Sequence, residues 1–125
     1  MKRIAGEPIE VFNNGRHSRD FTYIDDIVEG VVRALDHVPA PDPTFNALRP
    51  NPGSSNAPYR VYNIGNHSPV ELTRYIEAIE QATGRTAQKL LKPLQPGDVP
   101  DTYADVGELM RDVDYAPSTP IEVGI

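Results

Sequence analysis

The sequence predicts a small α/β or α+β domain, built from short strands with three to four helices. Apolar residues recur at helical spacing in two segments, and short runs rich in β-branched and aromatic residues lie before and between them. Prolines and glycines mark where most of these segments end. The 125 residues are enough for one domain, but aromatic residues make up only 7% of them and tryptophan is absent, so we expect a thin core.

The first segment predicts a strand over residues 9–12, which ends in a turn at Asn13-Asn14-Gly15. A helix is then expected from about residue 24 to residue 38, with Asp25 or Asp26 as its N-cap. Pro39 and Pro41 follow and prevent the helix from continuing. Six apolar residues at helical spacing form one stripe on this helix: Ile24, Ile27, Val28, Val31, Val32 and Leu35.

Residues 39–58 form a proline-rich loop that contains six of the thirteen prolines. Each proline fixes φ and lacks an N–H, so we expect an extended, exposed segment that is mobile unless a partner holds it. A loop of this length is either functional or a simple surface excursion, and the sequence leaves both interpretations open.

After the loop, residues 59–64 read as a strand that Gly65 ends. Ser68-Pro69-Val70-Glu71 has the pattern of a capping box with proline at the first helical position, so a helix is expected from there to Gly84. Three shorter elements complete the prediction: a strand at Leu90-Leu91, a helix opened by Asp105 and Glu108, and a helix start at Thr119–Glu122.

The composition excludes several classes of function. Twelve Lys and Arg against eighteen Asp and Glu give a net charge of −6, which argues against nucleic-acid or anionic-membrane binding. There is no cysteine for a disulfide, thiolate metal site or thiol nucleophile, and no apolar run approaches a membrane span of about 18 residues. Because the N-terminal stretch also lacks a signal-peptide pattern, we expect a cytoplasmic protein.

Several catalytic motifs are missing from this chain. No two glycines are spaced as in G-x-G-x-x-G, and there is neither a phosphate loop nor a Tyr-x-x-x-Lys pair. His17, His37 and His67 lack metal-ligand spacing, and for each we expect a surface or capping role. We therefore predict no catalytic residue, no metal ligand and no bound cofactor within this chain.

Three constellations carry possible chemistry. Arg16–Asp20 could clamp a phosphate through an arginine or could be a solvated charge run. The turn Gln95–Pro100 presents an amide and a carboxylate that could bind sugar hydroxyls, or it is an ordinary β-turn. The glycine in Tyr62–Asn66 could allow close backbone approach, or it simply ends a strand.

A resemblance changes the weight of these alternatives. The stretches RDFTYIDDI (residues 19–27), VYNIG (61–65) and LQPGDVP (94–100), followed by Tyr103-Ala104-Asp105, occur in this order and spacing. This pattern resembles the C-terminal part of the extended short-chain dehydrogenase/reductase family, the nucleotide-sugar epimerases and dehydratases. It is most similar to the UDP-glucuronate 4-epimerases, from about Gly6 to the end of the chain.

The resemblance implies a UDP-sugar-binding part, spanning residues 1–125, of an NAD-dependent epimerase that acts through a 4-keto intermediate. In this family a separate N-terminal Rossmann domain holds NAD and the catalytic Tyr and Lys, and a further helix follows the present stretch. By position, Glu10 and Phe12 would present the strand to uracil, Arg19 would hold the diphosphate, and Asp98, with Gln95, would reach the ribose. Related UDP-galactose 4-epimerases carry an arginine where this chain has Gln95, which leaves Arg19 as the main clamp.

Three further expectations follow from the resemblance. The isolated chain should be inactive and bind no NAD, and without the first half it should expose apolar surface. The full-length enzyme is expected to be a homodimer. The alternative is a stand-alone, non-catalytic module that binds a ligand or another protein.

Overall fold

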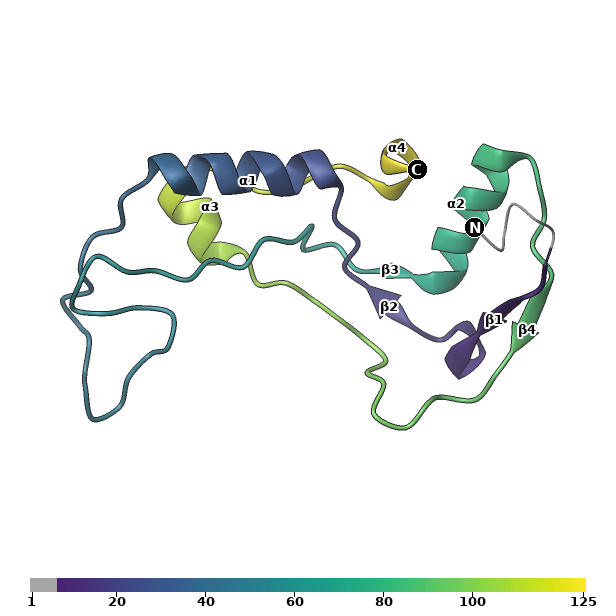
Figure 1. Ribbon diagram of the computed structural model, residues 1–125, viewed down its shortest axis with the longest axis horizontal. Helices are drawn as coiled ribbons and strands as arrows, with labels where there is room; N and C mark the ends of the chain where they lie inside the picture. Colours follow the sequence, from purple (N-terminus) through teal and green to yellow (C-terminus); the bar gives the residue numbers. More distant parts are fainter. Residues whose placement is uncertain (1–6) are drawn as a thin grey trace. The chain divides into compact units, whose positions relative to one another are not determined.

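The computed structural model describes residues 7–125 (Figure 1). Its elements follow one another as β1 (Ile9–Val11), the 3-10 helix η1 (Phe12–Gly15), β2 (Ser18–Arg19), α1 (Ile24–Asp36), β3 (Val70–Glu71), α2 (Leu72–Thr83), β4 (Lys89–Leu91), α3 (Gly107–Val113) and α4 (Ile121–Gly124). Four α-helices and short strands confirm the predicted α/β class. Among the described residues, 7–21, 68–103 and 119–125 form one unit, and 22–67 and 104–118 form a second.

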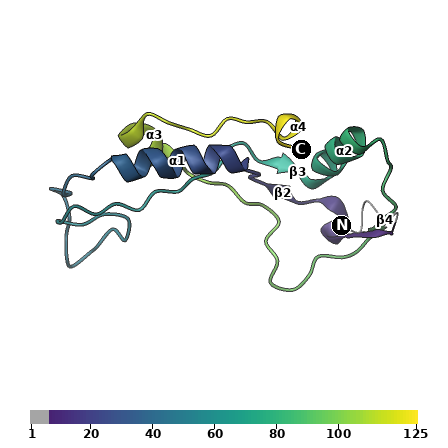
Figure 2. The same ribbon diagram turned by 45° about the horizontal axis from the view of Figure 1, so that its top comes forward.

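The first unit is built on two small sheets. β1 pairs with β4 in parallel, with Ile9 opposite Lys89 and Val11 opposite Leu91. β2 pairs with β3 in antiparallel fashion, with Ser18 opposite Glu71. Helix α2 follows β3 directly and lies beside the β1–β4 pair in both views (Figures 1 and 2).

The core of this unit lies between β1 and α2. Ile9 and Val11 are buried against Ile76, and Leu72 and Ala87 pack around them. Glu10 points to the opposite, exposed side of the strand, as the two-residue period of a strand requires. Since the buried cluster consists of only three residues, the core is as thin as the composition predicts.

The predicted turn after β1 is confirmed. Asn13, Asn14 and Gly15 all have left-handed backbone conformations, with φ of 51°, 52° and 81°. Asparagine and glycine tolerate this region better than other residues. A Cβ on Gly15 would also lie 3.1 Å from the Thr73 methyl group, so both conformation and space favour glycine. The turn directs the chain from β1 toward β2.

The predicted start of α2 is wrong by several residues. The capping-box pattern placed the helix start at Ser68, whereas α2 begins at Leu72 and has Glu71 as its N-cap residue, without a side-chain capping bond. The physical reason is tertiary: Val70 and Glu71 pair with β2 as strand β3. The predicted end is confirmed, because Gly84 adopts φ of 65° and its N–H donates to the carbonyls of the last turn.

The second unit packs α1 against the segments that include α3. Gly30 lies in contact distance of Ile64 and Tyr115, and the Tyr115 hydroxyl donates to the Asp26 carbonyl oxygen at 3.0 Å. The predicted N-cap is wrong: Tyr23 occupies that position, and Asp25 and Asp26 lie in the first turn. The Asp26 carboxylate instead accepts a hydrogen bond from the Ser118 backbone N–H at 3.2 Å.

The apolar stripe of α1 is not covered by the described part of the chain. Five of its six members are exposed: Ile24, Val28, Val31, Val32 and Leu35, which reaches 81%. The covered side of the helix instead centres on Gly30, its buried residue. The α1 boundaries agree with the predicted helix, but its apolar face remains open.

The predicted strand over residues 59–64 is not formed. The segment is irregular except for an isolated bridge between Arg60 and Ser54. A strand is defined by pairing, and nothing in residues 7–125 pairs with the rest of this segment. Its apolar residues therefore follow the strand pattern without a sheet to join.

The proline-rich loop is organised by one carboxylate. Asp42 accepts hydrogen bonds from the Thr44 N–H and hydroxyl at 2.8 and 2.7 Å, and from the Ser54 hydroxyl at 2.7 Å. Ser54 is buried, and the Asp42 N–H donates to the Ser55 carbonyl. The two arms of the loop are thus joined by hydrogen bonds, which proline content alone did not predict.

Candidate functional site

Arg19 and Asp98 meet in the first unit although 79 positions separate them in the sequence. Arg19 ends β2, and its Nη2 lies 3.2 Å from Asp98 Oδ1. Backbone hydrogen bonds from Ser18 to Pro100 and from Thr102 to Ser18 hold the 98–102 segment beside β2. The convergence of these two predicted site residues is a property of the fold rather than of local sequence.

The turn that presents Asp98 is the proline-braced turn read from the sequence. The Asp98 N–H donates to the Gln95 carbonyl at 3.2 Å, and Gly97 has φ of 83°. Proline followed by a left-handed glycine is the pattern of a type II turn. The turn brings the Asp98 carboxylate to β2, while Gln95 is exposed.

The guanidinium of Arg19 is anchored on one side. Its Nη1 donates to the carbonyls of Ser18 at 3.0 Å and Pro100 at 2.7 Å, and Nη2 donates to Asp98. Among the described residues these bonds use both Nη1 hydrogens and one Nη2 hydrogen, which leaves Nε–H and the second Nη2–H. Nε–H and an Nη2–H are donors that a guanidinium can offer to a phosphate or carboxylate.

His17 is the residue that sequence reasoning missed. Its side chain is only 5% exposed, and its Nε2 lies 3.3 Å from Asp98 Oδ2. The angle is not that of a hydrogen bond, and Nε2 has no other hydrogen-bond partner in the described structure. The sequence feature that could have revealed this role is the spacing of His17 and Arg19. Two residues that are two positions apart on an extended segment share a face, so both side chains can reach the same partner.

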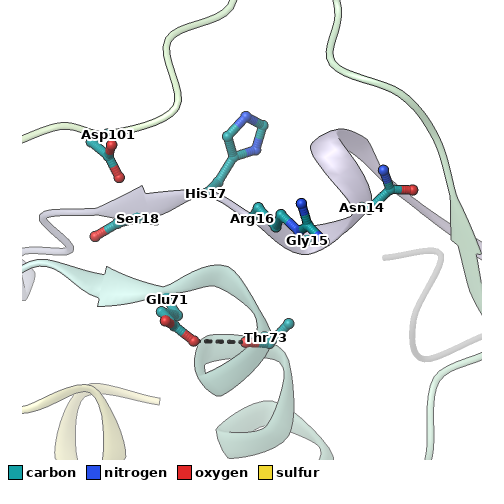
Figure 3. Close-up of a pocket in the computed structure, with 8 residues that line it drawn as sticks. All are labelled: Asn14, Gly15, Arg16, His17, Ser18, Glu71, Thr73 and Asp101. Carbon is teal, nitrogen blue, oxygen red and sulfur yellow. Dashed lines mark hydrogen bonds between the residues drawn. The ribbon is translucent and has the colours of Figure 1, made fainter.

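A cavity of about 300 Å³ lies next to this cluster (Figure 3). Its lining residues come from the turn, β2, β3, the start of α2 and the 98–102 segment: Asn14, Gly15, Arg16, His17, Ser18, Glu71, Thr73 and Asp101. In Figure 3 the His17 ring points to the opposite side of its strand from Glu71 and Thr73. Every lining residue except Gly15 has a polar or charged side chain, but none of the five residues assigned from the resemblance belongs to the lining.

Of the remaining predicted site residues, Gln95 belongs to the turn that presents Asp98, and the other two lie in β1 and η1. Glu10 is exposed on β1 and forms an ion pair with Lys92 at 3.6 Å. Phe12 begins η1 and is partly buried. The structure therefore shows one predicted pair in contact, while the assignments of Glu10, Phe12 and Gln95 stay predictions.

Most of the shifted pKa values fall in the second unit; the exception is Glu122 of the first unit, whose pKa a hydrogen bond from Arg74 lowers. Burial, with a hydrogen bond to Asp112 at 2.9 Å, raises the pKa of Tyr62 to about 12. Burial alone would raise the pKa of Asp112, but hydrogen bonds from Tyr62 and Arg111 outweigh it and lower that pKa. Arg60 lies 3.5 Å from Glu108 and 3.8 Å from Asp112, so this cluster is an ion-pair network that ties residues 60–62 to α3.

The chain matches a known protein family over its first half. Residues 1–65 match the NAD dependent epimerase/dehydratase family. The chain belongs to this family. The predicted resemblance is therefore confirmed at the level of the family.

Named relatives narrow the relationship. Over 98% of this chain, Protein CapI of Staphylococcus aureus is 50% identical, and over 96% a probable UDP-glucuronate 4-epimerase of Rhizobium meliloti is 44% identical. The chain spans only 36% of the length of each relative. The chain therefore corresponds to a part of these longer relatives.

A solved structure shares the fold. The UDP-glucuronic acid 4-epimerase of Bacillus cereus, in complex with UDP-glucuronic acid and NAD, superimposes with a TM-score of 0.75 at 26% identity. The match covers 98% of this chain and 34% of that one. The epimerase of Bifidobacterium longum in complex with NAD⁺ and UDP gives a TM-score of 0.74 at 24% identity, which supports the fold.

NAD does not fit the described residues of this chain. A dinucleotide pyrophosphate binds at a glycine-rich turn between a strand and the N-terminus of a helix. The glycines with positive φ are Gly15, Gly84 and Gly97, which lie in the turn before β2, after α2 and in the Gln95–Asp98 turn. None of these positions precedes a helix in the required way.

Two further negative findings concern residues 7–125. No helix there is both long enough and apolar enough to cross a membrane. That part of the chain also holds no group of three or more His, Asp or Glu side chains that could bind a metal ion.

Proposed function

We propose that this chain is the UDP-sugar-binding part of an NAD-dependent UDP-sugar 4-epimerase, with UDP-glucuronate as the substrate of the whole protein. The observation that carries the proposal is the contact between Arg19 and Asp98, a cation and a carboxylate brought together from distant parts of the chain. The named UDP-glucuronate 4-epimerase relatives and the Bacillus cereus complex support it. Hydride chemistry is supplied outside the described residues.

In this proposal Arg19 binds the diphosphate through its open edge. The anchored side of the guanidinium already contacts Asp98 and two carbonyls, so Nε–H and Nη2–H are held in one orientation before the ligand arrives. A preoriented planar fork loses less side-chain freedom on binding than a mobile one. Asp98 accepts hydrogen bonds from the ribose hydroxyls, and Gln95, in the same turn, also reaches the ribose.

The same proposal assigns β1 and η1 to the base. The exposed side of β1 at Glu10 and the ring of Phe12 would present backbone groups and a stacking surface to uracil. The proposal also includes three statements about the protein as a whole. Residues 1–125 act as one substrate-binding part, and the whole protein is a cytoplasmic homodimer. Nucleic acid and membranes are not among its partners.

The test is a titration of the 125-residue chain, followed residue by residue in ¹H–¹⁵N NMR spectra. UDP and UDP-glucuronate should shift the signals of residues 17–19 and 95–102, and uridine, which lacks the diphosphate, should bind more weakly. ADP is the control for the base, and it should shift fewer signals around Phe12. A folded chain that shows no change with millimolar UDP would overturn the proposal.

A further inference from the structure

We propose that His17 is a positioning residue that fixes the Asp98 carboxylate and thereby makes the site prefer ribose over 2′-deoxyribose in its nucleotide ligand. This inference rests on the proposed function, because it assumes that Asp98 faces the ribose. It assigns a role to a side chain that neither the family match nor the spacing of motifs singled out.

The two oxygens of Asp98 have separate partners. Arg19 Nη2 lies 3.2 Å from Oδ1, and His17 Nε2 lies 3.3 Å from Oδ2. Both partners come from one extended segment and are two residues apart, so they share a face of it. A carboxylate contacted at both oxygens cannot rotate about its Cβ–Cγ bond without losing one contact.

Burial separates the roles of the two partners. The His17 side chain is 5% exposed, whereas those of Arg19 and Asp98 are 26% and 31% exposed. Arg19 is therefore accessible enough to contact a ligand, and His17 holds Asp98 from the protein interior. In this proposal the ligand contacts Asp98 and Arg19, and His17 acts on it through Asp98.

In the described structure the Nε2 atom of His17 lacks a hydrogen-bond partner. Nε2 is buried without a hydrogen-bond partner among residues 7–125, although Asp98 Oδ2 is within 3.3 Å. A buried polar atom without a partner is unfavourable, and a carboxylate is a strong acceptor. A hydrogen bond from His17 Nε2–H to Asp98 Oδ2 would remove this defect, and it would hold the carboxylate in the orientation in which Oδ1 contacts Arg19.

Glu71 and Asp101 line the same cavity as His17, and Arg16 precedes it in the chain. In Figure 3, Glu71 bonds to Thr73 on the other side of the strand from the His17 ring. Among residues 7–125, Asp98 is thus the carboxylate that lies within ion-pair distance of the imidazole.

The experiment compares UDP with 2′-deoxy-UDP on the 125-residue chain and on two variants, His17→Ala and His17→Gln. We expect the parent chain to bind UDP about tenfold more tightly than 2′-deoxy-UDP. His17→Ala should remove most of this preference, because it should weaken the binding of UDP and leave the affinity for 2′-deoxy-UDP nearly unchanged. His17→Gln should restore part of it, since a side-chain amide N–H can still donate to Oδ2. His37→Ala, a histidine outside the cluster, is the matched control and should keep the parent preference.

Each outcome decides between the two proposals. If the folded parent chain does not bind UDP, the proposed function fails, and the role of His17 fails with it. If the parent chain binds UDP but does not prefer it over 2′-deoxy-UDP, the role of His17 is overturned while the proposed function stands. A preference that survives in His17→Ala also overturns the role of His17 alone. An equal loss of affinity for both nucleotides would show a structural role and would also overturn it. If His17→Ala does not fold, His17→Met, which fills the buried space without an N–H donor, takes its place and should lose the preference in the same way.

Discussion

Arg19 contacts the 98–102 segment and is proposed to bind the diphosphate. Its substitution therefore has two separable effects, one on ligand binding and one on the position of that segment. A charge-assisted hydrogen bond contributes about 1.5–3 kcal/mol. Arg19→Ala should therefore weaken UDP binding by about 10- to 150-fold, measured by NMR titration. Arg19→Lys should recover only part of the affinity, because an ammonium group cannot reproduce the planar fork.

The structural effect of Arg19 needs its own control. Arg19→Ala also removes the bonds to Ser18 and Pro100, which could loosen the 98–102 segment. Thr102→Val removes a nearby contact, the bond from the Asp20 N–H to the Thr102 hydroxyl, without touching the guanidinium. If both variants lower UDP affinity equally, Arg19 acts on the segment rather than on the phosphate.

Asp42 provides a second prediction at this scale, and it concerns pH. Hydrogen bonds from Ser54 and then Thr44 lower its pKa from 3.8 to about 2. Because the pKa is depressed in the folded state, the stabilisation is present above pH 3.8 and is lost as pH falls toward 2. The Asp42 carboxyl ¹³C signal should titrate near pH 2, and Ser54→Ala should move the midpoint upward. An unchanged midpoint in Ser54→Ala would contradict the assignment of that bond.

The site residues show what sequence can and cannot supply. The turn residues Pro96 and Gly97 determine a local backbone shape, and that shape was predicted correctly. The contact of His17 with Asp98 depends on chain segments that meet only after folding. Spacing along the chain therefore indicated candidate groups, but the pairing required the fold.

Helix α1 is the element whose open apolar face has the clearest consequence. We expect the 125-residue chain to self-associate through this face, because contiguous exposed apolar surface favours association. Val31→Glu combined with Leu35→Glu should shift the chain toward monomer in sedimentation velocity experiments. Leu48→Glu, at an equally exposed leucine in the proline-rich loop, is the matched control and should leave association unchanged.

Tertiary pairing explains the elements that were predicted wrongly. Val70 and Glu71 fit a helix N-terminus by pattern, but β2 recruits them into a ladder. Tyr59–Ile64 fits a strand, yet no described segment pairs with Val61–Ile64. Helix α1 and the end of α2 were predicted well, because periodicity, proline and glycine act within the segment itself.

At the scale of the whole molecule, we expect no saturable NAD binding up to millimolar concentration. The described glycines do not build the strand-to-helix turn that a dinucleotide requires. Isothermal titration calorimetry with NAD, using UDP as the positive comparison, measures this directly. A low-micromolar NAD site in this chain would contradict the division of labour proposed above.

The parallel pairing of β1 with β4 also determines when this chain can fold during synthesis. Ile9 pairs with Lys89, about 80 positions later in the chain. The β1–β4 ladder can form only after Lys89 has been synthesised and the chain between the two strands has closed into a loop. Until then, Ile9 and Val11 lack both their strand partner and much of their core. The first unit can therefore become stable only after residues 89–91 have been synthesised, so we expect β1 to stay unpaired while the segment between the two strands is made.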